Sequence, residues 1–192
     1  MEYLDPKLVM EAEANVAKIS PEINKIFQLM TPEIQALPTK APKEKLKVFY
    51  AIANQINDEV TPKTACKNGC NHCCHQAVGI STEEAKRISR AIGRPYLALT
   101  THEPINVRTQ QALAGVPCVF LEEGKCSIYE HRPMVCRTYF NVSDTVEICD
   151  TIKKPGAKVP NLNFNGFMKM FVEQMSDGHW YDIRQWFPNG RH

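Results

Sequence analysis

The sequence predicts a mainly α-helical protein, a single small domain of several helices with one short β-hairpin. Apolar residues recur at helical spacing between residues 6 and 60 and again between residues 162 and 175. Two short apolar runs flank a glycine turn, as the strands of a hairpin do. All eight cysteines lie between Cys66 and Cys149, and clustered thiols are ligands for soft metals. We therefore expect the helices to be organised around a Cys-rich metal centre.

Composition and charge argue against several classes of protein. The chain has 192 residues, 43% of them hydrophobic and 23% charged, which is typical of a globular domain. Its net charge of +2 gives no argument for nucleic acid as a partner. No apolar run approaches the roughly 18 residues that span a bilayer. The first residues do not resemble a secretory signal, so we expect a cytoplasmic protein without a membrane partner. In that reducing compartment, clustered cysteines are metal ligands or redox-active thiols rather than disulfides.

Residues 1–61 are expected to form an N-terminal helical layer. Pro6 suits the first turn of a helix. The sequences that begin at Ser20 and Thr31 each place a proline after an N-cap residue, so each predicts the start of a new helix. A longer amphipathic helix is predicted to end before Thr61, because a proline follows that residue. The layer is expected to pack against the metal core or to form a dimer surface, and a protein partner stays open.

Residues 62–150 are expected to form a cysteine-cluster metal-binding core. The stretch 66–75 is predicted to form loops and short turns that wrap the metal. Ser81 and Glu84 make a capping box at the start of a helix, and Gly93 ends that helix. The remaining predicted elements are a short helix through residues 107–113, a hairpin with strands 118–121 and 125–128, and a short helix that begins at Pro133 and carries Cys136.

Residues 151–192 are expected to form a C-terminal helix and an aromatic tail, both packing on the core. Apolar residues from Leu162 to Met175 predict the helix, and its methionines at helical spacing indicate core packing. The aromatic residues in 179–181 and 186–187 are predicted to close the chain as a hydrophobic clamp. The three parts together are expected to make one structural domain.

The cysteines are numerous enough for zinc sites, but their spacing is not that of a usual zinc site. Cys66, Cys70 and Cys73 follow the pattern C-x3-C-x2-C, and Cys74 follows directly. Thiolates select zinc, Cu(I) or iron–sulfur clusters over hard ions. Eight cysteines are enough for two zinc sites of four ligands each. However, consecutive cysteines point in different directions, and the paired C-x2-C knuckles of a zinc ribbon are absent from the sequence.

The same spacing fits an iron–sulfur cluster, because a loop of this length can wrap three corners of a cubane. The fourth corner would come from Cys118, Cys126 or Cys136. The leftover thiols, Cys74 among them, would hold a second metal centre or pack nearby. The candidate metal ligands are therefore all eight cysteines: Cys66, Cys70, Cys73, Cys74, Cys118, Cys126, Cys136 and Cys149.

Two arginines are the candidates for cofactor binding. Arg132 and Arg137 flank Cys136, and guanidinium groups can hydrogen-bond thiolates and offset their negative charge. Binding of an anionic ligand is one alternative, and an ion pair with Glu130 or Asp144 is another. The two imidazoles of the stretch are left open as metal ligands or solvated loop residues: His72 and His75.

Four motifs follow one another along the chain: Cys66-x3-Cys70-x2-Cys73-Cys74, Pro117-Cys118-x-Phe120-Leu121, Gly124-x-Cys126-x-Ile128-Tyr129 and Arg132-Pro133-x2-Cys136-Arg137-x-Tyr139. In this order they resemble the YkgJ-type cysteine-cluster family (CxxCxxCC), whose members are described as zinc- or iron-chelating proteins. The resemblance covers about residues 62–150. A related cysteine cluster in flagellin lysine methylases is linked to an iron–sulfur cluster. The resemblance therefore favours a 4Fe–4S cluster here, with zinc as the alternative.

The predicted function is that of a metal-binding protein whose clustered cysteines hold an iron–sulfur cluster or zinc. Its role would be structural, electron transfer or metal handling. The alternatives are a cluster-dependent modification enzyme, for example one that transfers methyl groups to lysine, a thiol redox switch, and a zinc-type interaction module. The sequence has no glycine-rich cofactor loop and no convincing Ser-His-Asp set. It is also too short and too helical for the barrel of radical S-adenosylmethionine enzymes. Whether the chain is an enzyme stays open.

Overall fold

The computed structural model describes residues 5–67, 69–99, 104–150, 153, 157–175, 177 and 179–188. This part of the chain is mainly α-helical and contains two small antiparallel sheets of two strands each. The predicted mainly α-helical fold class is confirmed. None of the described helices is long and apolar enough to cross a membrane.

The α-helices are α1 (Pro6–Leu29), α2 (Thr31–Gln35), α3 (Pro42–Val60), α4 (Thr82–Ile92), α5 (Val107–Ala112), α6 (Met134–Thr138), α7 (Asn165–Met175) and α8 (Ile183–Trp186). The strands are β1 (Gly79–Ile80), β2 (Leu121–Glu122), β3 (Lys125–Cys126) and β4 (Tyr181–Asp182). Short 3₁₀ helices are η1 (Leu37–Thr39), η2 (Thr61–Lys63), η3 (His72–His75), η4 (Tyr129–His131) and η5 (Glu147–Cys149).

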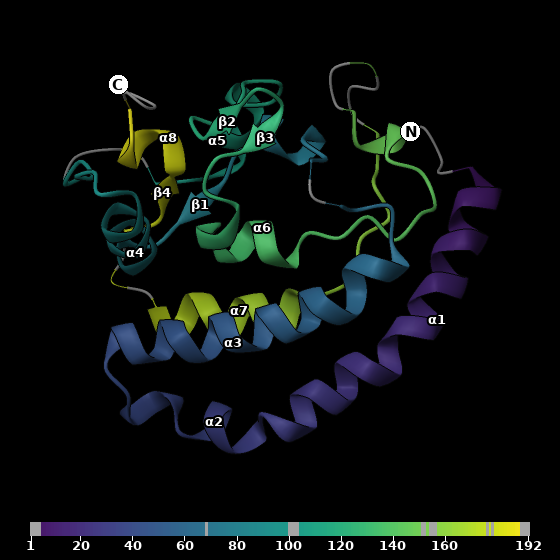
Figure 1. Ribbon diagram of the computed structural model, residues 1–192, viewed down its shortest axis with the longest axis horizontal. Helices are drawn as coiled ribbons and strands as arrows, with labels where there is room; N and C mark the ends of the chain where they lie inside the picture. The colour runs from purple at the N-terminus through teal and green to yellow at the C-terminus, as the bar shows by residue number, and fades with distance from the viewer. Residues whose placement is uncertain are drawn as a thin grey trace.

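Helices α1, α3 and α7 form a layer with a shared apolar core, which we call the helical layer. Figure 1 shows α3 running beside α7, with α1 crossing beneath them and α6 above them. Phe49 of α3 is fully buried and packs edge-on against Phe171 of α7, with 5.0 Å between the ring centroids. Because α6 also contacts α3, the layer is the base on which one cysteine-bearing helix rests.

Helix α1 is longer than the sequence predicts. A new helix was expected to begin at Ser20, but α1 continues through Pro21. The buried residues Ile19, Ile23 and Ile26 lie on one face of the continuous helix, so packing against the rest of the layer overrides the start signal. The Ser20 hydroxyl donates a hydrogen bond to the carbonyl of Val16 at 2.7 Å instead of capping a new helix.

Most other predicted boundaries are confirmed. A helix begins at Thr31, and α3 ends at Val60, next to Thr61. The Ser81 hydroxyl caps α4, and the Glu84 carboxylate accepts the backbone N–H of Ser81, which completes the capping box. Gly93 ends α4 in the left-handed conformation with φ of 66°. Helix α7 begins at Asn165, three residues later than the apolar pattern starts.

The predicted hairpin is present but its strands are shorter. Leu121 of β2 pairs with Cys126 of β3, and the pairing does not extend back to Cys118. The turn residues Glu123 and Gly124 have φ of 48° and 75°. Two positive φ angles in a two-residue loop are typical of the type I′ turn that suits a twisted hairpin.

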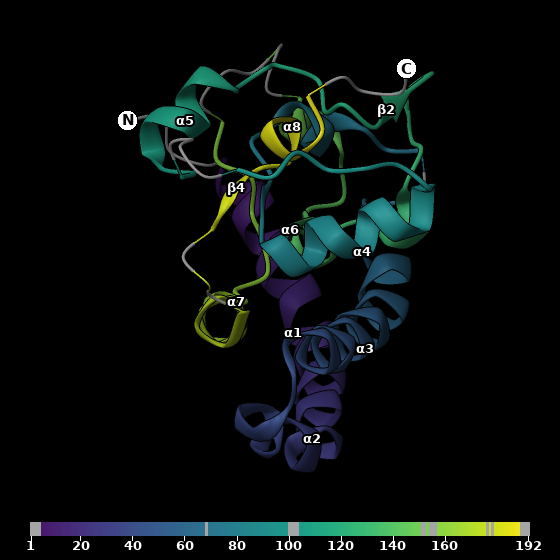
Figure 2. The ribbon, with the colours of Figure 1, turned by 90° about the vertical axis from the view of Figure 1, so that its left-hand side faces the viewer.

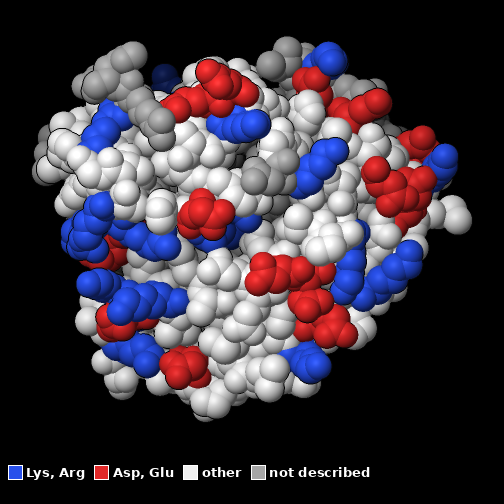
Figure 3. Space-filling view, viewed as in Figure 1, with Lys and Arg blue, Asp and Glu red and all other residues white. Residues whose placement is uncertain are grey.

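A second apolar core lies above the helical layer and includes the C-terminal tail. Strands β1 and β4 pair with each other although they are far apart in sequence, and this sheet was not predicted. Trp186 and Phe187, from the tail where the sequence predicts an aromatic clamp, are fully buried in this core. Figure 2 shows α4, α6 and α8 stacked above α3, with α2 at the opposite end. On the face in Figure 3, acidic and basic side chains lie beside one another.

Candidate metal centre

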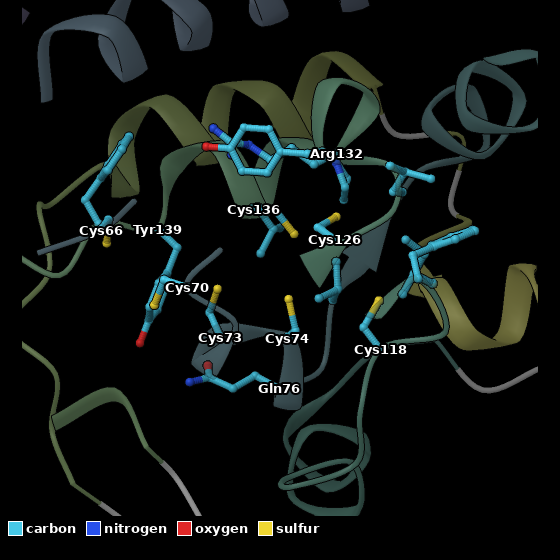
Figure 4. Close-up of a pocket in the computed structure, with 18 of the residues that line it drawn as sticks. Cys66, Cys70, Cys73, Cys74, Gln76, Cys118, Cys126, Arg132, Cys136 and Tyr139 are labelled. Carbon is cyan, nitrogen blue, oxygen red and sulfur yellow. The ribbon is translucent and has the colours of Figure 1, made fainter. Parts of the chain in front are cut away.

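Seven of the eight cysteines line a single cavity of about 120 Å³. Figure 4 shows Cys66 and Cys70 toward one end of this cavity and Cys118 and Cys126 toward the other. All eight cysteines are free thiols. The lining cysteines come from the stretch 66–75, from the hairpin region and from α6: Cys66, Cys70, Cys73, Cys74, Cys118, Cys126 and Cys136.

The stretch 66–75 has the expected loop and turn structure, although Asn68 lies outside the described residues. Gly69 has φ of 90°, which an L-residue with a side chain rarely adopts. The stretch is tied to the segment before the hairpin by two backbone bonds. The N–H of Cys118 donates to the carbonyl of Cys74 at 2.7 Å, and the N–H of Gly115 donates to the carbonyl of His75 at 2.8 Å.

The two thiols of the hairpin region, Cys118 and Cys126, have similar surroundings. The backbone N–H groups of Phe120 and Ile128 donate hydrogen bonds to the thiols of Cys118 and Cys126, each two residues earlier. The Phe120 and Ile128 side chains are buried in the second apolar core. Both cysteines of the hairpin region are thus followed, two residues later, by a buried apolar residue.

A buried carboxylate positions the helix that carries Cys136. Glu84 accepts hydrogen bonds from the backbone N–H of Met134 at 2.7 Å and from the Tyr50 hydroxyl at 2.9 Å. It thereby joins α3, α4 and the first turn of α6. Burial raises the pKa of Glu84 above its usual value. The capping box was visible in the sequence, but this second role of Glu84 was not.

Arg132 lies at the wall of the cavity. Its guanidinium stacks on the Tyr129 ring, 3.9 Å from the ring centroid, and donates a hydrogen bond to the Asn57 side chain. Its Nε–H is buried and has no hydrogen-bond partner among the described residues. A half-buried guanidinium beside several thiols supplies positive charge where thiolates would carry negative charge.

Arg137 does not line the cavity. Its guanidinium donates to the backbone carbonyls of Arg132 and Glu130 and to the Asn54 side chain. It also stacks over Tyr50 at 4.7 Å. Arg137 therefore closes the loop before α6, and its hydrogen bonds go neither to a thiol nor to the Glu130 carboxylate.

The thiols differ in how easily they lose a proton. A hydrogen bond from the Cys74 thiol, helped by the charge of Arg132, lowers the pKa of Cys73 to about 7. Burial raises the pKa of Cys118 to about 11 and that of Cys136 well above its usual value. Buried thiols of this kind become thiolates when a cation is present to stabilise the charge.

Arg184 in the C-terminal tail holds the two loops that meet at the cavity. Its guanidinium donates to the carbonyls of Gln76, Val116 and Pro117 at distances of 3.2, 2.6 and 3.1 Å. It is paired with the fully buried Asp182 at 3.0 Å. The sequence predicts an aromatic clamp in this tail but not the role of Arg184. A lone arginine in a tail carries no sequence signal for this role.

Three of the candidate metal ligands lie outside the cavity lining. Neither His72 nor His75 lines it, and Nδ1 of His75 is 3.3 Å from the carbonyl of Asn71. Cys149 is buried at the end of η5 and does not line it either.

The arrangement of the cavity thiols suits a metal cluster or several ions better than a single metal ion. In the part of the chain that the structure describes, no three His, Cys, Asp or Glu side chains are arranged to hold a single metal ion. The thiols instead surround a space of about 120 Å³, several times the roughly 15 Å³ that one water molecule needs. Thiolates in this number suit iron–sulfur clusters or several soft ions.

Residues 65–157 match the family model CxxCxxCC, described as "Putative zinc- or iron-chelating domain". The predicted resemblance to the cysteine-cluster family is confirmed, and the match supports metal binding in general terms. Searches of curated proteins and of solved structures found no match.

Proposed function

We propose that the chain is a metalloprotein whose cavity cysteines hold an iron–sulfur cluster, a 4Fe–4S cluster being favoured. Its role is structural, electron transfer or metal handling. Seven thiols around one cavity support this function most strongly. A tetrahedral zinc site needs four ligands within about 2.3 Å of one point, and the described side chains are not arranged in that way. A cluster bridges donors that stand farther apart.

When bound, the cluster supplies one-electron transfer and cross-links the segments that ligate it. The residues of the chain would tune its environment. Arg132 offsets negative charge at the wall, and backbone N–H groups donate to the thiols of Cys118 and Cys126. Apolar side chains such as Phe120 and Ile128 limit the access of water. Eight free thiols fit a reducing compartment such as the cytoplasm.

A thiol redox switch is the second candidate function. The neighbouring thiols of Cys73 and Cys74 are hydrogen-bonded to each other, and the pKa of Cys73 is lowered to about 7. A thiol with such a pKa is a reactive nucleophile when no metal is bound.

Anaerobic purification followed at once by an absorption spectrum and analysis of iron, zinc and sulfide tests the proposal. We expect a brown protein with broad absorption near about 400 nm and matching iron and sulfide contents. A colourless protein with zinc would contradict the cluster but keep metal binding. A protein that binds neither metal and forms a Cys73–Cys74 linkage on mild oxidation would favour the redox switch.

A further inference from the structure

A second cavity lies beside the cavity that the cysteines line, and we call it the polar pocket. Its volume is about 500 Å³, which is within the range of small-molecule sites. Its wall comes from the C-terminal part of α3, from η2, from η4 and from α6, and every lining residue except Pro62 is polar or charged. No cysteine lines this pocket, so it is distinct from the candidate metal ligands.

The polar pocket and the cysteine cavity share a wall. The residues that line both cavities are Asn57, Thr61, Tyr129 and Arg132. Figure 4 shows Arg132 at the edge of the cysteine cavity. A molecule in the polar pocket would therefore contact the same side chains that enclose the metal centre.

The two arginines of the pocket are held in place by groups that carry no charge. The buried Arg137 guanidinium donates to the carbonyls of Arg132 and Glu130. Arg132 donates to the Asn57 side chain, which itself donates to the carbonyls of Ala53 and Arg137. These bonds leave further N–H groups on both guanidiniums. Among the described residues, neither arginine forms an ion pair with a carboxylate.

Two carboxylates complete the charged groups of the pocket. Asp58 lies near the end of α3 and Glu130 lies in η4, and both residues are exposed. In the part of the chain that the structure describes, neither side chain forms an ion pair or a hydrogen bond. The pocket therefore offers two positive and two negative groups that do not pair with each other.

We propose that the polar pocket binds a free α-amino acid. The carboxylate of the ligand is bound by Arg132 and Arg137, because guanidinium groups bind carboxylates through paired N–H groups. The ammonium group of the ligand is bound by Asp58 and Glu130. A zwitterion matches both signs of charge in the pocket, whereas a phosphate would place further negative charge near two carboxylates. The inference goes beyond the proposed function, because the pocket contains no thiol and is the same beside a cluster or beside zinc.

Calorimetric titration of the chain, as purified anaerobically, tests this pocket. The standard L-amino acids are screened one at a time, and the tightest binder is compared with two of its derivatives. The N-acetyl derivative lacks the ammonium charge, and the C-terminal amide lacks the carboxylate. We expect each derivative to bind at least about tenfold more weakly, because each loses charge-assisted hydrogen bonds. Inorganic phosphate is the probe for a site that selects negative charge alone.

The variant Asp58→Asn should weaken amino-acid binding at least about tenfold, because it removes one charge from an exposed side chain of similar size. Glu59→Gln is the matched control on the same helix. Glu59 does not line the pocket and pairs with Lys63 at 3.3 Å, so binding should be unchanged. Thermal melting of both variants shows that they are folded.

Four results would overturn the proposal: no amino acid binds, either derivative binds as tightly as its parent, phosphate binds as tightly and displaces the amino acid, or the two variants bind equally well. Metal analysis of the same samples keeps this test separate from the proposed function. A chain that binds an amino acid but carries no metal would refute the metal centre and retain the pocket.

Discussion

The helical layer and the cysteine segment are built by different means. In the layer, long helices bury apolar side chains such as Phe49 and Phe171 against one another. In the segment from Cys66 to Cys149, the strands have two residues each and α6 has five. Its parts are joined by buried polar groups and surround an open space lined by thiols. The first region is stabilised by its apolar core alone. The second has the smaller second apolar core beside the cavity and should gain further stability from what its thiols bind.

This difference predicts how each region responds to mutation. Loss of a ligand should affect the cysteine segment, and loss of an apolar side chain should affect the layer. The polar groups between the regions should have intermediate effects on both.

The largest effect is expected for Cys70→Ser and Cys73→Ser. Each should lose metal and most of the stability of the cysteine segment, because structural metal sites contribute on the order of 10 kcal/mol. Elemental analysis and thermal melting measure the two effects. His72→Ala is the control, since His72 does not line the cavity. Full metal content and unchanged melting in both serine variants would show that this stretch is not the site.

Phe49→Ala should destabilise the layer by about 3 to 5 kcal/mol, because it removes a fully buried aromatic ring. The folded variant should retain its metal. Urea unfolding followed by circular dichroism, with metal analysis of the folded fraction, measures both. Val172→Ala is the matched control on α7, with a side chain that is 39% exposed and an expected change below about 0.5 kcal/mol. Equal effects of the two substitutions would contradict a core at this place.

Arg184→Ala should cost about 3 kcal/mol, because it leaves the buried Asp182 carboxylate without its charged partner. Metal affinity should also fall, since the loops at Gln76 and Pro117 lose their shared donor. Arg184→Lys keeps the charge but lacks the fork that reaches several carbonyls, so it should be intermediate. Unfolding curves and metal titration test this order, and a lysine variant as weak as the alanine variant would favour charge-independent packing.

Glu84→Gln should cost about 1 to 2 kcal/mol, because an amide is a poorer partner for the N–H of Met134. It should also change the pH dependence of stability. Burial raises the pKa of Glu84, so above the ordinary glutamate pKa the folded chain keeps a proton that the unfolded chain has released. Stability therefore falls as pH rises from the unfolded to the raised folded pKa. The urea midpoint of the parent chain should fall as pH rises from about 4 to about 8. The midpoint of the variant should fall less over the same range.

The smallest effect is expected for His179→Ala. His179 stacks on Tyr181 with 6.1 Å between ring centroids and lies outside the cavity lining. Stability should change by about 0.5 kcal/mol or less, and metal content should stay the same. Metal loss in this variant would contradict the assignment of the tail to packing.

Much of the fold could be predicted because helix boundaries depend on local chemistry. The capping box at Ser81, the stop at Gly93 and the glycine turn at Gly124 act within a few residues of the chain. The continuation of α1 through Pro21 and the pairing of β1 with β4 depend on contacts between distant segments. No local pattern carries that information.

The candidate site divides in the same way. The clustering of Cys66 through Cys74 and the hairpin that carries Cys126 were visible in the sequence. The role of Arg184 comes from backbone groups that it reaches across the fold, so its residue type gave no signal. From the sequence, the predicted partners of Arg137 are thiolates, an anionic ligand or carboxylates. In the structure it donates hydrogen bonds to backbone carbonyls, which come close to Arg137 only in the folded loop.

Hydrogen exchange with and without metal compares the two regions most directly. The chain is purified anaerobically, divided into loaded and chelated samples, and followed by mass spectrometry. If metal stabilises the cysteine segment, chelation should expose the amides of residues 69–99 and 104–150 while α1, α3 and α7 stay protected. Equal loss in both regions, or unchanged protection in both, would contradict the account.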